Sequence, residues 1–207
     1  NPLAALKGQV QLLQRRARRH QQLSAADLEQ PLRAIESIGD RMTAMIEELV
    51  DVAQLRSGHP LRLRQEPVDL VSLCKRRIEE HQHATTQHQI HVFCEHEHVI
   101  GWWDARRLER VLDNLLTNAV KYSQGGTIEV RLGCEERAGA PWAKLEIEDQ
   151  GVGIPAADLP FIFERFRRGS NVENRVAGTG LGLAGAREVV MQHGGEVSID
   201  SEEGRGT

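Results

Sequence analysis

Three polar residues share one face of a predicted helix and are suited to a metal ion and a phosphate. Asn114, Asn118 and Lys121 are spaced by four and three residues, so they project from the same side of a helix. An amide oxygen is a hard ligand that suits Mg²⁺, and an ammonium group pairs with phosphate. Each residue alone is more typical of a solvated helix face, so the stripe indicates a binding site only together with other motifs.

A carboxylate and two glycines follow directly on a predicted strand. Asp149 closes a segment in which Leu145 and Ile147 alternate with polar residues, and Gly151 and Gly153 come next. Glycines let the backbone turn tightly and approach a ligand closely. A carboxylate at this position can accept a hydrogen bond from an exocyclic amine. By itself the pattern is typical of a common turn.

Aromatic and cationic residues gather in residues 161–168, which hold three of the four phenylalanines of the chain. Aromatic anchors beside guanidinium groups can clamp a polyphosphate. A small satellite core would produce the same pattern. The residues concerned are Phe161, Phe163, Phe166, Arg165, Arg167 and Arg168.

A glycine-rich segment, Gly178-Thr179-Gly180-Leu181-Gly182, leads into a predicted helix. Free backbone N–H groups at a helix N-terminus attract an anion, and the helix dipole adds to this attraction. The segment does not fit the dinucleotide-binding fingerprint, because no βαβ unit with an acidic residue about 20 positions further on fits around it, and it lacks the Gly-Lys-Ser/Thr of a Walker A loop.

Helix and strand patterns alternate from about residue 61 onward. This order predicts an α/β sandwich with helices on one face of a mixed sheet, and a further strand is expected after Thr207. Asp69 and Asp104 are predicted to cap helices, the second reaching Ser123. A third helix is predicted over 181–193, and strands over 61–64, 90–94, 99–103, 128–132, 145–147 and 196–200.

Residues 1–57 are predicted to form an all-α helical hairpin that precedes the sandwich. Apolar residues recur there every three to four positions, close to a heptad period. Such a hairpin pairs with a second copy as a four-helix bundle, or packs on its own domain. Residues 56–60 form a predicted linker, so the expected domains are 1–57 and 58–207.

Composition excludes several classes of protein. With 40% hydrophobic and 27% charged residues, the 207-residue chain is typical of a globular protein, and its net charge of −4 argues against nucleic-acid binding. No apolar run is long enough to span a membrane. Three widely spaced cysteines predict no disulfide framework and a reducing compartment. The chain begins without Met, so we expect a piece of a longer protein.

In this order, the four motifs together resemble the catalytic domain of histidine kinases, which is related to gyrase, Hsp90 and MutL. Residues 114–123 resemble its N box, 149–153 its G1 box, 161–166 its F box and 178–182 its G2 box. The hairpin is similar to the dimerisation and phosphotransfer domain of that family, and Asn1-Pro2-Leu3 matches the end of its H box. The resemblance implies a Bergerat-type ATP-binding fold over about residues 60–207.

The resemblance also implies a role for each matched residue, with ATP and Mg²⁺ as cofactors. Asn118 would coordinate Mg²⁺ beside Asn114, Lys121 would contact phosphate, and Asp149 would accept from the adenine amino group. Residues 155–177 would form a mobile lid over the nucleotide. Further nucleotide contacts are implied for Tyr122, Gly151, Gly153, Ile154, Phe163, Gly178, Thr179, Gly180, Leu181 and Gly182, and catalytic roles for Asn114, Lys121 and one of Arg165 and Arg168.

The phospho-accepting histidine of the family would sit four positions before the residue matched by Asn1, outside this sequence. We therefore expect ATP binding without self-phosphorylation at the usual position. In gyrase-like relatives a glutamate four residues before the metal-binding Asn activates water. Asn114 stands there, and an amide cannot act as a general base, so we expect slow ATP hydrolysis. The alternatives are a catalytically silent nucleotide-binding dimerisation module and a gyrase- or MutL-like ATPase.

The implied partners are a second copy of the chain and a response regulator receiver domain, which accepts phosphate on an aspartate. A cytoplasmic location is expected, in a parent protein that can be membrane-anchored.

Two further patterns leave alternatives open. The arginines of residues 15–19 suit a solvated bundle face or an acidic partner better than nucleic acid. Six of the nine histidines fall within residues 81–98 without zinc-ligand spacing, and a polar, exposed stretch is favoured over a metal site or pH sensor.

Overall fold

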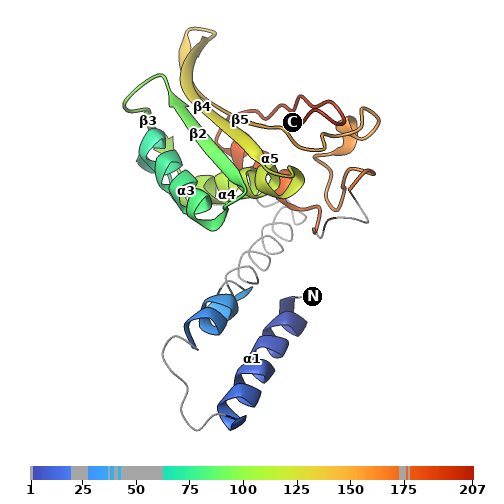
Figure 1. The fold of residues 1–207 in the computed structure, drawn as a ribbon. Coiled ribbons are helices and arrows are strands. Elements are labelled where there is room, and N and C mark those ends of the chain that lie inside the picture. Colours follow the sequence, from blue (N-terminus) through green and yellow to red (C-terminus); the bar gives the residue numbers. More distant parts are fainter. Residues whose placement is uncertain are drawn as a thin grey trace. The chain divides into compact units, whose positions relative to one another are not determined.

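The chain forms two compact units, Asn1–Leu61 and Arg62–Thr207. A computed structural model describes residues 2–19, 28–36, 38–39, 42, 63–172, 176 and 178–207 (Figure 1). None of the helices in these described ranges combines the length and apolar character needed to cross a membrane.

The N-terminal unit is helical, and the predicted helical hairpin region is confirmed. Helix α1 spans Pro2–Arg19, and residues 28–36 are helical as well. Val10 and Leu12 of α1 and Leu32 of the second helical stretch are exposed within one copy of the chain. The apolar positions between residues 43 and 57, and the side chains of Arg16, Arg18 and Arg19, lie outside the described residues.

The C-terminal unit contains a mixed three-stranded sheet and a separate two-stranded ribbon (Figure 1). In the sheet, β2 (His88–Cys94) runs parallel to β4 (Gly126–Arg137), which forms a long antiparallel hairpin with β5 (Ala140–Asp149). The ribbon pairs β1 (Glu66–Asp69) with β3 (Ile100–Trp103). The register of the hairpin sets Asp149 opposite Ile128, so Asp149 lies at the end of the sheet where β4 begins.

Helices cover one face of the sheet, which confirms the predicted α/β sandwich. Helices α3 (Leu70–Ala84) and α4 (Ala105–Tyr122) pack their apolar stripes against the inward side chains of β2 and β4. Helix α5 (Gly182–Gln192) packs on α4 rather than on the sheet. The most deeply buried side chains are Val71, Cys74, Leu112, Leu116, Ile128, Val130 and Leu132.

A side-chain cap defines the start of α4, and a glycine turn follows its end. At its start, the side chain of Asp104 accepts from the backbone N–H of Arg107 at 3.2 Å, as predicted, and also from that of Arg64 at 2.9 Å. At its end, Gly125 and Gly126 have φ values of +116° and +103°, which allow an immediate turn into β4. Helix α4 is therefore fixed as a rigid support for its polar stripe.

Two predicted strands are wrong. The strand expected over residues 61–64 lies instead at Glu66–Asp69, because pairing with β3 selects that register despite its Pro67; residues 61 and 62 lie outside the described part. Residues 196–200 form no strand, since they make no ladder with β5 or any other described strand. Alternation marks a half-buried segment, but a strand also requires a partner edge in register.

Truncation of the core beneath the sheet will test this packing. Leu116 is fully buried between the α4 helix and the sheet, so Leu116→Ala should lower the free energy of unfolding by about 2–5 kcal/mol. Its exposed neighbour Thr117 is the matched control, and Thr117→Ala should change stability by no more than about 0.5 kcal/mol. Urea denaturation measures both. Equal losses for the two variants would contradict this packing.

Candidate functional site

The polar stripe of α4 lies against the glycine-rich loop of residues 178–182. The amide of Asn114 donates to the carbonyl of Gly182 at 3.4 Å. Near the other end of the stripe, a Cβ placed on Gly178 would lie 2.9 Å from Nζ of Lys121. The loop therefore runs along α4 from Lys121 to Asn114, and Asn118 lies between these two contacts on the same helix face.

The end of α4 also supports the turn that follows β5. The N–H of Val152 donates to the carbonyl of Tyr122 at 3.0 Å. A Cβ on Gly151 would lie 2.6 Å from that same carbonyl oxygen and 2.6 Å from Oδ1 of Asp149. Only glycine fits at this position without displacing its surroundings. Two segments far apart in sequence are thus brought together on α4.

Asp149 is half-buried at this junction. Burial raises the pKa of its carboxyl group above the ordinary value, while the N–H of Gly151, which donates to Oδ1 at 2.8 Å, acts in the opposite direction. Its backbone exchanges hydrogen bonds of 2.9 and 3.3 Å with Thr207. A partly desolvated carboxylate with a raised pKa, held at a strand end, is typical of a ligand-binding position.

Gly153 and Ile154 contact other parts of the protein. Gly153 has φ +63°, and a Cβ there would lie 2.0 Å from the backbone oxygen of Glu202. The N–H of Ile154 donates to Oγ of Ser201 at 2.9 Å, and Nδ2 of Asn171 donates to the carbonyl of Gly153 at 3.0 Å. The close approach predicted at Gly153 is therefore one that the chain's own backbone makes. Sequence reasoning did not identify Ser201, which belongs to no motif, and it included Asn171 only as part of the predicted lid, without this contact.

The segment predicted as a lid is folded back on itself over its described part, residues 155–172 and 176. The carboxylate of Asp158 accepts from the N–H and the hydroxyl of Ser170 at 2.7 and 2.8 Å, and these bonds lower its pKa. A short 3-10 helix, η1, spans Leu159–Phe161. Residues 173–175 and 177 of the predicted lid lie outside the described residues.

The aromatic segment meets the glycine-rich loop directly. The N–H of Phe166 donates to the carbonyl of Gly180 at 2.8 Å, and both residues have positive φ values, +65° and +70°. A Cβ on Gly180 would lie 2.7 Å from backbone atoms of Phe166 and Arg167. The third and fourth motifs therefore form one packed unit, an association that their sequence separation did not reveal.

The two candidate arginines differ in their contacts. Arg168 donates to the carbonyls of Val172, at 3.0 Å, and Val176, and its Nε would lie 3.7 Å from a Cβ on Gly178, next to Lys121. Arg165 is half-buried, with no hydrogen bond or ion pair to another described residue. The structure thus brings Arg168 to the loop beside Lys121.

The remaining predicted residues support the loop. Nζ of Lys121 donates to the hydroxyl of Tyr122 at 3.1 Å, and that hydroxyl would lie 3.7 Å from a Cβ on Gly178. Oγ1 of Thr179 accepts from the N–H of Leu181 at 3.4 Å, and Leu181 is buried. Phe163 is half-buried, and the guanidinium of Arg187 lies 5.3 Å from its ring centre. Tyr122 therefore joins the predicted site, while Phe163 is an anchor on α5.

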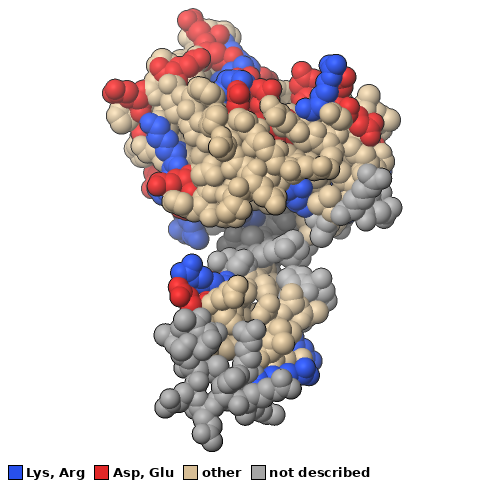
Figure 2. Space-filling model, viewed as in Figure 1, with Lys and Arg blue, Asp and Glu red and all other residues tan. Residues whose placement is uncertain are grey.

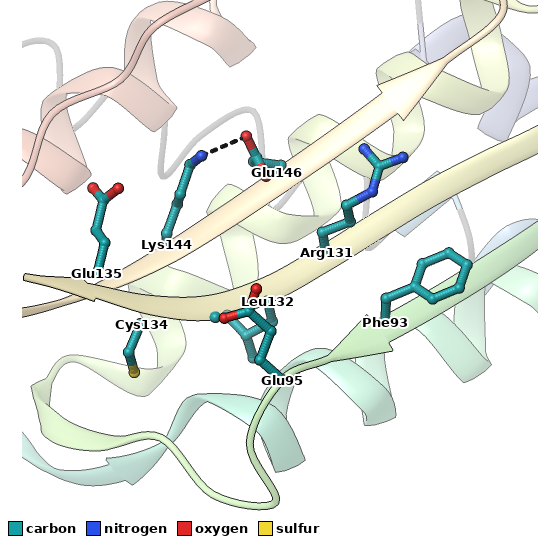
Figure 3. A pocket seen from close by; sticks show the side chains of 9 residues that line it. Phe93, Glu95, Arg131, Leu132, Cys134, Glu135, Lys144 and Glu146 are labelled. Carbon is teal, nitrogen blue, oxygen red and sulfur yellow. Dashed lines mark ion pairs between the residues drawn. The ribbon is translucent and has the colours of Figure 1, made fainter.

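A separate hollow of about 280 Å³ lies over β2, β4 and β5 (Figure 3) and contains none of the predicted site residues. Within this lining Lys144 pairs with Glu146 at 2.7 Å, while Arg131 and Glu135 form ion pairs with residues outside it. On the face of the C-terminal unit shown in Figure 2, acidic and basic residues are interspersed around an uncharged centre. We assign no ligand to either surface.

The histidine-rich segment is only partly as predicted. His98 is exposed, but His88 is just 5% exposed, so the expectation of a polar surface stretch is wrong at that position. The reason is that His88 begins β2 with its side chain toward the helices. Within the described ranges, no group of three His, Cys, Asp or Glu side chains is arranged to hold a metal ion.

Comparison with known proteins agrees with this geometry. Residues 103–207 match the family described as histidine kinase-, DNA gyrase B-, and HSP90-like ATPase, and residues 1–58 match the His Kinase A (phospho-acceptor) domain. The probable sensor histidine kinase TcrY of Mycobacterium tuberculosis is 36% identical over 98% of this chain and 41% of its own length. The sensor histidine kinase YkoH of Bacillus subtilis is 34% identical over 87% of this chain and 38% of its own length.

Solved structures show the same fold. The structure of full-length ShkA in complex with AMPPNP matches with a TM-score of 0.65 and 26% identity, over 89% of this chain and 38% of that one. The chain spans about two fifths of the length of the two curated relatives. The resemblance read from the four motifs is confirmed: the chain belongs to the histidine kinase-, DNA gyrase B- and HSP90-like ATPase family, and within it to the sensor histidine kinases.

Proposed function

We propose that the C-terminal unit binds Mg-ATP between α4, the turn at residues 149–153 and the loop at 178–182, and donates its γ-phosphoryl group to a histidine of the hairpin domain. The phosphoryl group then passes to an aspartate of a response regulator. The observation that carries the proposal is the glycine loop lying along the polar stripe of α4, from Lys121 to Asn114. Membership of an ATPase family and the AMPPNP complex of ShkA support the choice of nucleotide.

The residues at this site fit a magnesium triphosphate. A Cβ on Gly178 would meet Lys121, and one on Gly182 would lie 3.2 Å from Oδ1 of Asn114, so glycine leaves the backbone N–H groups accessible at the start of α5. In the proposal, Asn118 and its neighbour Asn114 offer amide oxygens to Mg²⁺, which when bound neutralises phosphate charge. Lys121 and Arg168 place two cations beside the loop.

Base recognition falls to Asp149 in this proposal. Its carboxylate is half-buried, so a hydrogen bond that it accepts from the adenine amino group is shielded from water and discriminates strongly. Gly151 keeps the approach to this carboxylate open, and Tyr122 lies between the base end and the phosphate end of the site.

The proposed chemistry is phosphoryl transfer rather than hydrolysis. Phosphoryl transfer requires positioning and charge stabilisation more than covalent help from the protein. Asn114 occupies the place where a glutamate would activate water, and its amide cannot accept a proton from water. The nucleophile is then the acceptor imidazole, which the H-box match places four residues before Asn1.

We further propose residues 1–57 as the dimerisation and phosphotransfer domain and residues 58–207 as the ATP-binding domain. The exposed Val10, Leu12 and Leu32 suit pairing with a second hairpin. Since ATP and receiver domains are cytoplasmic, we place this part of the protein in the cytoplasm. Magnesium dependence, the dimer and the receiver partner are all open to direct tests.

Removal of the proposed magnesium ligand should abolish the contribution of the metal to ATP affinity. For the native chain, we expect tighter ATP binding with Mg²⁺ than with EDTA in titration calorimetry, and for Asn118→Ala we expect no difference between the two conditions. The exposed neighbour Thr117 supplies the control, because Thr117→Ala should keep the native magnesium dependence. A magnesium effect that survives in Asn118→Ala would remove the metal role.

Substitution of Asp149 should separate stability from binding. A pKa raised in the folded state means that the contribution of this group to stability is fully present below its ordinary pKa of 3.8 and is lost as pH rises through the raised value. At pH 7, Asp149→Asn should therefore leave the free energy of unfolding unchanged or higher, since Oδ1 can still accept from Gly151. ADP affinity should fall about tenfold or more, because an amide N–H₂ faces the adenine amino group.

Nucleotide choice provides the control for Asp149→Asn. A nucleotide whose base lacks the exocyclic amino group should bind the native chain weakly and lose little further affinity in Asp149→Asn. Equal losses for both nucleotides would contradict adenine recognition by this carboxylate.

Intrinsic hydrolysis by the chain should be slow. With an amide at position 114 there is no general base for water, so phosphate release from ATP should not exceed that of Asn118→Ala under the same conditions. A coupled phosphate assay measures both rates. Rapid, Asn118-dependent turnover would instead favour a gyrase- or MutL-like ATPase.

A further inference from the structure

A buried histidine supports the end of the helix that carries the proposed site. His88, the first residue of β2, is 5% exposed. Its Nε2 lies 3.1 Å from the backbone nitrogen of Gly125, whose N–H donates to it, so this ring nitrogen is an acceptor. The ring proton is then on Nδ1, which lies 3.0 Å from Oγ1 of Thr85. This pattern corresponds to one neutral tautomer.

The same ring nitrogen contacts the cap of α4. Oγ of Ser123 lies 2.8 Å from Nε2 of His88 and 2.5 Å from the carbonyl oxygen of Ala119, so its hydroxyl proton is shared between these two acceptors. Ser123 is the C-cap residue of α4, and Gly125 lies in the turn that leads to β4. A single imidazole thus joins the end of α3, the start of β2 and the end of α4.

This junction is adjacent to the groups that would bind nucleotide. Ser123 directly follows Lys121 and Tyr122, and the carbonyl of Tyr122 accepts the N–H of Val152. His88 itself pairs with Gly126 across the parallel strands, two residues before Ile128, which lies opposite Asp149. The last turn of α4 is therefore held between His88 on one side and the turn at 149–153 on the other.

We infer that His88 is a positioning residue for the nucleotide site, acting through Ser123 and Gly125 on the last turn of α4. This inference rests on the proposed nucleotide-binding function. Loss of the acceptor would leave the N–H of Gly125 without its partner and release the end of α4. Lys121 and the carbonyl that supports Val152 would then move away from their binding geometry.

A second histidine makes the same kind of contact at the opposite end of the helix and serves as the matched control. Nε2 of His193 accepts from the backbone N–H of Asp104 at 2.9 Å, and its Nδ1 donates to the carbonyl of Val189 at 2.8 Å. Helix α4 has 18 residues, so this contact lies roughly 27 Å from the one made by His88, at 1.5 Å per residue.

Three substitutions distinguish positioning from general support. Asparagine reproduces Nδ1 of histidine but is too short to place an acceptor at Nε2, whereas the carbonyl of glutamine can reach that position. We expect His88→Asn to weaken Mg-ATP binding about tenfold and His88→Gln to stay within about threefold of the native chain. His193→Asn should lower the free energy of unfolding but bind Mg-ATP with the affinity of the native chain. Titration calorimetry and urea denaturation of each folded variant provide the two measurements.

The isosteric variant Thr85→Val extends the test to a milder change. It removes the acceptor of the Nδ1 proton and should weaken Mg-ATP binding about threefold, even if His88→Asn fails to fold. Unchanged affinity in Thr85→Val and in folded His88→Asn would overturn the inference, as would equal losses of affinity in His88→Asn and His193→Asn. Absence of Mg-ATP binding by the native chain would instead overturn the proposed function itself.

Discussion

The close approach of two backbone segments to α4 is the constraint on which this site depends. The turn after β5 contacts the last residue of the helix through Gly151, and the loop before α5 contacts its polar stripe through Gly178 and Gly182. A side chain at Gly151 would lie 2.6 Å from the carbonyl of Tyr122, and one at Gly178 would lie 2.9 Å from Lys121. Helix α4 can act as this support because its other face is buried against the sheet and its start is capped by Asp104.

The arrangement concentrates groups that a protein rarely assembles for stability alone. Lys121 and Arg168 both approach Gly178, so two like charges lie near each other, and Asp149 is partly desolvated with a raised pKa. Each of these features costs stability when the site is empty of ligand, and each becomes favourable beside an anion or an amine. The balance of charge therefore supports a nucleotide site more strongly than any single residue does.

Sequence-based expectations agree best with the structure where they depend on the residues of a single helix or strand. The spacing of Asn114, Asn118 and Lys121 predicts a shared face because a helix repeats every 3.6 residues, and the structure has that helix with the predicted cap. The strand predicted over residues 196–200 was wrong because alternation reports burial rather than pairing. The expected surface exposure of His88 is wrong for a similar reason, since its burial is set by the strand it begins and by the helices that face it.

Residue order and local patterning determined by themselves which motifs are present, which helix carries the polar stripe, and that Asp69 and Asp104 begin helices. Tertiary structure alone decided that Arg168 reaches the loop, that Gly153 packs on the backbone of Glu202, and that His88 contacts the end of α4. The physical reason is the distance along the sequence between the residues that make each contact. Caps and helix faces depend on neighbours within four residues, whereas these contacts join segments that meet only after the sheet register and the helix packing have been set.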